Sequence, residues 1–272
     1  MKVLESLCIG KFDKERCEDA LFRSENFIAV IDGVSSKTTF RYQGKTTGKI
    51  AAELIDAALQ TLPADADLSD FIAAVNSAYS DCYKKINFPE QERQEKGLQA
   101  VCALYSKHRR TIWQIGDCQV LVDGKEYKNS KKSDRIICEM RNLILEELQQ
   151  RDGNFLPSEH EAKILDVLFP WMIQTIRFAN STATDYGYSV LNGTPIPESL
   201  IQTIPLGLSV HEIVLASDGY PQLCQTLAQS EQVLAEMLKK DPQGRKLFDT
   251  VRLIKEDQKS FDDRTYIRFL TD

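Results

Sequence analysis

Acidic residues stand at the ends of several apolar segments in this sequence. The segment Phe27–Ile31 stops at Asp32, and the segment Ile213–Ala216 leads to Asp218. The other acidic residues beside predicted strands are Asp117 after Gly116, Asp262 and Asp263 before the last apolar segment, and the pair Glu18 and Asp19. Carboxylates at strand ends can converge on one rim of a sheet, where they repel one another unless a cation lies between them. Their placement therefore predicts a site for divalent metal ions.

The residue types favour magnesium or manganese over softer metals. The chain has three histidines, none at metal-ligand spacing from another, and seven cysteines without a Cys-x-x-Cys pair. The ligands must therefore be oxygen atoms. Gly33, directly after Asp32, suits such a site because its backbone can approach closely and offer a carbonyl oxygen. Two ions roughly 3.5–4 Å apart activate a water and stabilise the displacement of a phosphate, so the predicted chemistry is phosphoester hydrolysis.

Asp-Gly is also a common turn sequence, and the chain contains it four times. Asp123-Gly124 is typical of a hairpin turn, and Asp152-Gly153 is typical of a helix end. For any single Asp-Gly pair the turn interpretation is the favoured one. Asp32 and Asp218 are interpreted as ligands because each ends an apolar strand and is followed by helical sequence.

The order of these motifs resembles that of the metal-dependent protein phosphatases, the type 2C serine/threonine phosphatases. The motifs are Glu-Asp at 18–19, Ala-Val-Ile-Asp-Gly at 29–33, Ile-Gly-Asp at 115–117, Ala-Ser-Asp-Gly at 216–219 and Asp-Asp-Arg-Thr at 262–265. Each motif alone is weak, whereas five in this order across nearly the whole chain are fairly specific. The resemblance implies an α-β-β-α sandwich with a dinuclear metal centre at one end of its two sheets.

The resemblance also implies roles for individual residues. Asp32 corresponds to the carboxylate that bridges the two ions, with the Gly33 carbonyl as a further ligand. The other implied ligands are Asp218 and Asp262 for the first ion, Glu18 and Asp19 for the second, and Asp117 with Asp218 for a third, weaker site. Asp32 and Asp218 are accordingly the predicted catalytic residues. The implied cofactors are two Mn²⁺ or Mg²⁺ ions, with a third site beside them.

Three positions depart from the family's pattern. Lys14 stands where the family usually has a phosphate-binding arginine, and its single ammonium predicts weaker or altered phosphate binding. Val34 stands where His or Met is usual and cannot act as a general acid, while Asp263 replaces the usual Asn and adds negative charge near the metals. These departures leave open a second hypothesis, a catalytically weak pseudophosphatase that binds phosphoproteins or regulatory partners. An active enzyme is the favoured interpretation because no expected metal carboxylate is missing.

Other motifs compete with this interpretation. The segment 44–49 resembles a phosphate-binding loop, but three residues instead of four separate its glycines, and Ile50 replaces the Ser or Thr that would bind magnesium. Ser217 lacks the flanking glycines of a nucleophilic serine. The basic residues at 107–110 and 125–132 include Lys131 and Lys132. The basic residues of these two segments favour a solvated loop, with a docking patch for phosphorylated or acidic partners as the alternative.

Hydrophobic periodicity predicts the elements that must position these residues. Strands are predicted at about 2–9, 27–31, 98–105, 110–116, 119–123, 187–191, 211–217 and 264–270. Helices are predicted at 47–62, 68–85, 136–150 and 159–178, with two short helices between 221 and 247. This order favours an α+β fold, with two mainly antiparallel sheets flanked by helices, over a doubly wound parallel sheet. We expect one phosphatase-like domain over 1–272, with a divergent helical elaboration or flap at about 124–200.

The composition is that of an ordinary globular protein. The chain has 272 residues, 42% of them apolar and 27% charged, and 34 basic against 40 acidic residues give a net charge of −6. This balance argues against a nucleic-acid partner. No apolar run is long enough for a membrane span, and the N-terminal residues carry charges too early for a signal peptide. The scattered cysteines favour reduced thiols and a cytoplasmic location.

Together these features predict a cytoplasmic, metal-dependent phosphatase. Its predicted partner is a phosphorylated protein substrate, carrying phosphoserine or phosphothreonine, with a small phosphorylated metabolite as an alternative. No membrane or nucleic-acid partner is expected, and the sequence leaves the oligomeric state open.

Overall fold

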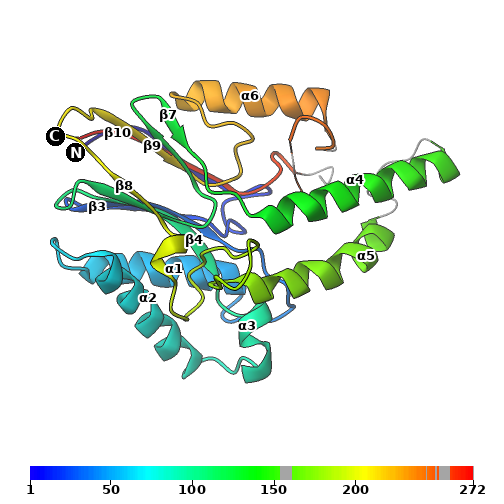
Figure 1. The fold of residues 1–272 in the computed structure, drawn as a ribbon, viewed down its shortest axis with the longest axis horizontal. Helices are drawn as coiled ribbons and strands as arrows, with labels where there is room; N and C mark the ends of the chain where they lie inside the picture. The colour runs from blue at the N-terminus through cyan, green and yellow to red at the C-terminus, as the bar shows by residue number, and fades with distance from the viewer. Residues whose placement is uncertain (154–160, 243, 249, 251–257, 272) are drawn as a thin grey trace.

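Two antiparallel sheets form the inner layers of the structure (Figure 1). The computed structural model describes residues 1–153, 161–242, 244–248, 250 and 258–271. One sheet has the strand order β1-β10-β9-β6-β7, and the other has the order β2-β3-β4-β5-β8. The strands are β1 (Lys2–Ile9), β2 (Ala20–Arg23), β3 (Phe27–Gly33), β4 (Ala100–Ser106), β5 (Thr111–Ile115), β6 (Gln119–Val122), β7 (Lys125–Tyr127), β8 (Gln202–Pro205), β9 (Glu212–Ala216) and β10 (Arg264–Leu270).

Helices cover the outer faces of both sheets. The α-helices are α1 (Thr47–Thr61), α2 (Leu68–Tyr83), α3 (Arg93–Lys96), α4 (Lys132–Asp152), α5 (Glu161–Gln174) and α6 (Leu227–Lys240), and the short 3-10 helices are η1 (Glu90–Glu92), η3 (Thr175–Phe178) and η4 (Glu198–Leu200). Helices α1 and α2 pack on the sheet that contains β3, and α6 lies over the other sheet (Figure 1). Among the described residues, no helix is both long enough and apolar enough to cross a bilayer.

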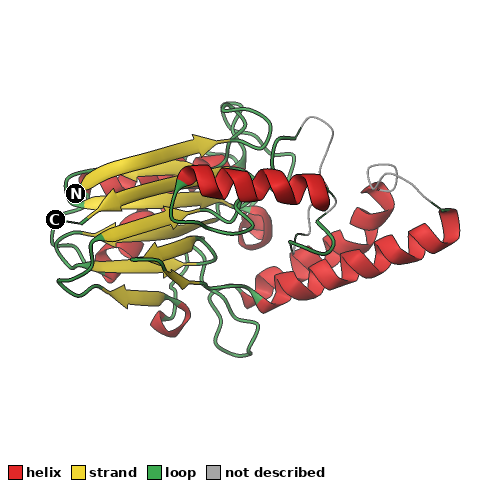
Figure 2. Ribbon diagram, turned by 90° about the horizontal axis from the view of Figure 1, so that it is seen from above, coloured by secondary structure: helices red, strands yellow, loops and turns green. Residues whose placement is uncertain are grey.

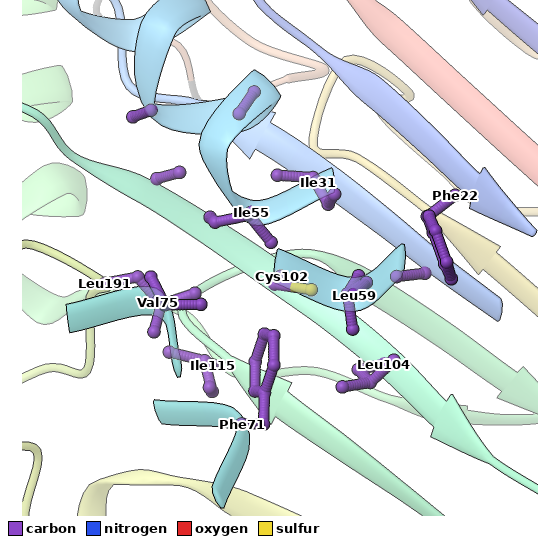
Figure 3. Packing of buried hydrophobic residues seen from close by; sticks show 14 of the residues in the cluster. Phe22, Ile31, Ile55, Leu59, Phe71, Val75, Cys102, Leu104, Ile115 and Leu191 are labelled. Atoms are coloured by element: carbon purple, nitrogen blue, oxygen red, sulfur yellow. The ribbon is translucent and has the colours of Figure 1, made fainter. Parts of the chain in front are cut away.

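Strand β3 is apolar without interruption because both of its faces are buried. Phe27, Ala29 and Ile31 belong to the core between this sheet and helices α1 and α2, and Figure 3 shows Ile31 beside Ile55 of α1. The alternate side chains, Ile28 among them, belong to the core between the two sheets. A strand buried on both faces needs apolar residues at every position. The first polar side chain, Asp32, therefore comes where the strand leaves the core.

Helices α4 and α5 extend side by side beyond the end of the sheets (Figure 2). They carry a small core of their own, which includes Ile137 and Leu145 of α4 and Ile164 and Leu168 of α5. In Figure 1 the two chain termini lie at the opposite end of the sheets from this hairpin. Helix α4 ends at Asp152 and is followed by Gly153, whose φ of 79° is a conformation that glycine adopts without strain. The helix end predicted at Asp152-Gly153 is thus confirmed.

The predicted fold class is confirmed, and several element predictions need correction. Residues 187–191 form only isolated bridges, such as the one between Ala100 and Leu191, instead of a strand. The two short helices predicted after Pro221 are one helix, α6, because the chain stays in a loop until the Thr226 side chain caps the helix. Strands β2 and β8 were not predicted, and β7 was predicted only through the hairpin turn at Asp123-Gly124, which the pairing of β6 with β7 confirms. The first two residues of the helix predicted at 159–178 lie outside the described residues.

Candidate metal centre

Four aspartates from both sheets line one cavity at the end of the sandwich that faces α4 and α5. Asp32 is near the end of β3, Asp117 lies between β5 and β6, Asp218 follows β9, and Asp262 precedes β10. The cavity has a volume of about 570 Å³. Carboxylates that the chain separates by up to 230 residues (Asp32 to Asp262) therefore meet at one place. The order of strands in the two sheets brings them together.

The carboxylates of this cavity raise one another's pKa values. Burial raises the pKa of Asp32 well above its ordinary value, and the charges of Asp19 and Asp218 raise it further, followed by those of Asp262 and Asp117. Burial likewise raises the pKa of Asp19, and the charge of Asp263 adds to this effect. Buried, mutually repelling carboxylates hold protons more tightly unless a cation neutralises them. The group is therefore electrostatically suited to a bound cation.

Glu18 and Asp19 are buried behind the cavity wall and are held by hydrogen bonds. Thr46 Oγ1 donates to Glu18 Oε1 at 2.5 Å, and Thr265 Oγ1 donates to Asp19 Oδ2 at 2.8 Å. The Glu18 backbone N–H donates to Asp263 Oδ2 at 2.7 Å. Neither Glu18 nor Asp19 is among the lining residues of the cavity. The charge of Asp19 nevertheless acts strongly on Asp32.

Two glycines allow the backbone to pass closely around the carboxylates. A Cβ atom on Gly33 would lie 2.5 Å from the Gly48 carbonyl oxygen and 2.6 Å from that of Glu18. A Cβ atom on Gly219 would lie 2.1 Å from the Asp263 carbonyl oxygen. Real Cβ atoms do not approach other atoms so closely. Packing therefore requires glycine at positions 33 and 219, in addition to any turn preference of the Asp-Gly pair.

Lys11 is a cation at this site that the sequence analysis did not single out. Its Nζ lies 2.8 Å from Asp262 Oδ1 and 3.4 Å from Ser35 Oγ. Its backbone N–H donates to Asp263 Oδ1 at 2.8 Å. Lys14, the predicted phosphate-binding residue, is exposed and is not among the lining residues of this cavity. Of these two lysines, Lys11 therefore lines the cavity, and Lys14 does not.

Lys131 is a second cation inside the cavity. Its Nζ lies 3.1 Å from Asp117 Oδ2 and 5.0 Å from the centre of the Tyr188 ring. Burial opposes its charge, yet the nearby carboxylates, Asp117 foremost, raise the pKa of Lys131 well above its ordinary value. The interpretation of this lysine as part of a solvated basic loop was therefore wrong. Lys132 does fit that interpretation, since its side chain is 60% exposed.

Apolar side chains of the α4–α5 hairpin form part of the cavity wall. Its lining includes Ile137 of α4 and Ile164, Leu165, Phe169 and Met172 of α5. Leu165, Phe169 and Met172 are spaced by four and three residues, so they share one face of α5. The cavity therefore combines the aspartates at the sheet ends with apolar side chains of the hairpin.

The donor set fits a hard divalent cation. In the described part of the chain, no three acidic, histidine or cysteine side chains are already grouped tightly enough to hold a metal ion. The donors are nevertheless all oxygen atoms, they are crowded and largely buried, and the Lys11 ammonium lies 2.8 Å from Asp262 as a cation would. Oxygen donors of this type are those that Mg²⁺ and Mn²⁺ prefer. A metal ion bound by Asp262 would compete with this ammonium for the carboxylate.

Comparison with known proteins identifies the family. Residues 12–250 match the family described as protein phosphatase 2C, and the chain belongs to this family. The resemblance found in the motif order is thereby confirmed. A comparison with curated protein sequences finds no match.

Solved structures of serine/threonine phosphatases are similar to this one at low sequence identity. The PstP/Ppp phosphatase of Mycobacterium tuberculosis is 15% identical, with 100% of both chains covered and a TM-score of 0.47. The catalytic domain of PstP in complex with two manganese ions is 16% identical, with 100% of both chains covered and a TM-score of 0.48. The phosphatase Stp1 of Staphylococcus aureus is 12% identical, with 99% of this chain and 95% of that chain covered and a TM-score of 0.48.

Proposed function

We propose that this chain is a Mn²⁺- or Mg²⁺-dependent phosphatase that hydrolyses phosphoserine and phosphothreonine in proteins. The observation that carries the proposal is the convergence of Asp32, Asp117, Asp218 and Asp262 on one cavity. Membership in the protein phosphatase 2C family supports the choice of reaction and of substrate class. The crowding of oxygen donors around Asp32 supports the choice of metal.

The proposal gives each residue of the site a task. Asp32 would hold both ions, and the Gly33 carbonyl would be a further ligand. Asp218 and Asp262 would complete the first position, and Glu18 and Asp19 the second. Two divalent ions held there supply an activated water and neutralise charge on the phosphate. Asp117, the residue predicted to serve a third ion, lies in the same cavity and is ion-paired with Lys131.

The residues of the chain itself account for binding and orientation. Lys11, once released from Asp262, would bind phosphate oxygens, because Lys11 lines the same cavity and its Nζ reaches Asp262 there. Thr46 and Thr265 orient Glu18 and Asp19 through the hydrogen bonds that they donate. Val34 also lines the cavity and has no proton to donate to the leaving alcohol. We therefore assign no protein side chain as the general acid.

The proposal is tested by phosphatase assays with a matched pair of variants. The purified chain is assayed on p-nitrophenyl phosphate and on a phosphothreonine peptide with Mn²⁺, with Mg²⁺ and with EDTA. Asp32→Asn should reduce kcat by about 100-fold or more, as the loss of a group that stabilises the transition state does. Asp123→Asn changes the same motif at a hairpin turn, where Asp123 accepts hydrogen bonds from the backbone of 211 and 212, and should keep full activity. Turnover that persists in EDTA or in Asp32→Asn would refute the proposed mechanism.

One observation favours a second candidate function. The ammonium of Lys11 lies 2.8 Å from Asp262, where it competes with a metal ion. A chain in which that ion pair persists would be a pseudophosphatase that binds a phosphorylated partner without hydrolysing it. Tight binding of the phosphothreonine peptide without turnover at saturating Mn²⁺ would select this candidate.

Two further proposals concern organisation and location. We propose that α4 and α5 are an elaboration of a single phosphatase domain, because their apolar faces line the same cavity as the aspartates. We also propose a cytoplasmic location, because all seven cysteines are free thiols. Limited proteolysis tests the first, since the sandwich and the hairpin should resist cleavage as one unit. Fractionation of the source cells tests the second.

A further inference from the structure

Asp117 is paired with a lysine inside the cavity. Lys131 Nζ lies 3.1 Å from Asp117 Oδ2, and the two side chains are 16% and 20% exposed. The Tyr188 ring centre lies 5.0 Å from the same Nζ, and Asp134 Oδ2 lies 3.9 Å from it. The ammonium is thus surrounded by two carboxylates and the face of a ring. All three favour a positive charge at this position.

The start of α4 directs this lysine inward and its neighbour outward. Lys131 is the residue that precedes the helix, with an extended backbone (φ −78°, ψ 122°), and Ser133 in the first turn is buried. Lys132 instead has a 60% exposed side chain and lies 3.6 Å from the 91% exposed Asp185. Adjacent lysines of the same loop therefore differ in burial and in partner. Of the two lysines, only Lys131 points into the cavity.

We propose that the Lys131 ammonium takes the place of a third metal ion at Asp117, so that this chain holds two divalent ions instead of three. The inference rests on the proposed function, because it concerns the stoichiometry of the same metal centre. An ammonium at hydrogen-bonding distance from a carboxylate occupies the region in which a metal ion would lie. It also repels a second cation there. Lys131 acts through Asp117 and is therefore a positioning residue.

The arrangement has a consequence for the charge of the site. A bound ion at Asp117 would bring two positive charges that come and go with the metal concentration. The lysine brings one positive charge that is always present at neutral pH, since a lysine beside carboxylates stays protonated. The site is then complete when two ions are bound. Its activity should not rise further at millimolar metal concentrations.

Metal stoichiometry tests the inference directly. We would measure the number of Mn²⁺ ions bound by the full chain, by equilibrium dialysis and by titration followed with electron paramagnetic resonance. The wild-type chain should bind two ions. Lys131→Met should gain a third, weaker ion, which the double variant Lys131→Met with Asp117→Asn should lose again. Lys131→Arg keeps the charge and should remain at two ions, and Lys132→Met, the matched control, should also remain at two.

The outcomes separate this inference from the proposed function. A third ion in the wild-type chain that Asp117→Asn removes would overturn the inference and leave the dinuclear centre intact. A folded Lys131→Met variant that still binds only two ions would overturn it as well. A wild-type chain that binds no Mn²⁺ would instead overturn the proposed function and this inference together. If Lys131→Met fails to fold, as judged by circular dichroism, the comparison of the wild-type chain with Asp117→Asn still decides the question.

Discussion

Replacement of Thr46 by valine should weaken both the start of α1 and the metal centre. The Thr46 hydroxyl accepts a hydrogen bond from the Lys49 backbone N–H at 3.1 Å and so caps the helix. The same hydroxyl donates to Glu18 Oε1 at 2.5 Å. Valine has nearly the same shape but lacks the hydroxyl, so the substitution removes two hydrogen bonds and little packing. Glu18 is 7% exposed, which makes the loss of one donor costly.

The magnitude follows from the two contributions. Loss of a threonine cap costs about 1 kcal/mol of stability. Loss of a hydrogen bond to a buried charged group costs about 1.5–3 kcal/mol. Thr46→Val should therefore lower the free energy of unfolding by about 2.5–4 kcal/mol, if the two contributions are additive. This is a sizeable part of the roughly 5–15 kcal/mol that stabilises a typical domain.

Thr226 provides a matched control for the capping contribution. Its side chain caps α6 by accepting from the Gln229 backbone N–H, and this helix lies over the other sheet, away from the aspartates. Thr226→Val should cost about 1 kcal/mol, the loss of one cap alone. Thr46→Ser keeps the hydroxyl and should stay close to the wild-type stability.

The assay is equilibrium unfolding in urea, followed by circular dichroism in EDTA and again in saturating Mn²⁺. The two valine variants should differ by about 1.5–3 kcal/mol in EDTA, which is the contribution of the bond to Glu18. Thr46→Val should also bind Mn²⁺ more weakly, whereas Thr226→Val should bind it normally. Equal stability losses in the two variants, with equal Mn²⁺ affinities, would refute the role assigned to Thr46.

Three further predictions follow from the same contacts. Burial and repulsion raise the pKa values of Asp19 and Asp32. The folded metal-free chain therefore binds more protons than the unfolded chain. Its stability must fall as the pH rises from the ordinary aspartate pKa through the raised pKa values. Tm measured in EDTA should thus decrease with rising pH, and less so in Asp32→Asn. Gly33→Ala should lower the free energy of unfolding by about 1–3 kcal/mol, because its Cβ would lie 2.5 Å from a carbonyl oxygen. Gly207→Ala, whose Cβ would have its nearest neighbouring atom at 3.9 Å, should be nearly neutral in the same thermal scan. Lys11→Met should bind Mn²⁺ more tightly in calorimetry yet show a higher KM for phosphorylated substrate, and unchanged values of both would contradict the role of this ammonium.

Strands buried on both faces are among the elements that the sequence predicted. Strands β3, β4 and β9 are almost completely buried, so their apolar runs are continuous and their ends are visible as the first polar residues. Asp32 and Asp218 could be singled out for the same reason. The family's motif order then predicted their convergence, which no local pattern specifies.

The elements that were missed, or predicted only through a turn, lie at sheet edges or are very short. Strand β7 has three residues, two of them exposed, and β8 (Gln-Thr-Ile-Pro) has one buried residue, Ile204. Both β7 and β8, like β2, lie at the edge of a sheet. Pairing with one neighbour leaves most of such a strand in solvent, so its sequence carries little hydrophobic signal. Conversely, Val190 and Leu191 are buried without forming a regular strand, which explains why 187–191 had the composition of one.

The lysines of the site could not be assigned from spacing because their positions are set by distant parts of the chain. Lys11 is held at both its backbone N–H and its Nζ by Asp263 and Asp262, which lie about 250 residues away in the sequence. Lys131 is turned inward by the start of α4, while Lys132 has the same residue type and the opposite orientation. A long flexible side chain reaches several places from one Cα position. Only the tertiary partners decide which place it takes.

Asp263 shows how a departure from the family's pattern can be structural. The sequence suggested that an acid in place of the usual Asn adds negative charge for the metals. Its charge does act on Asp19, and its two carboxylate oxygens also accept the backbone N–H groups of Lys11 and Glu18, at 2.8 and 2.7 Å. An asparagine has one acceptor oxygen and would turn its NH₂ group toward one of these donors. The carboxylate therefore joins the segment that carries Lys11 to the segment that carries Glu18. In this chain Asp263 thus holds both Lys11, the cation of the site, and Glu18, its buried acid.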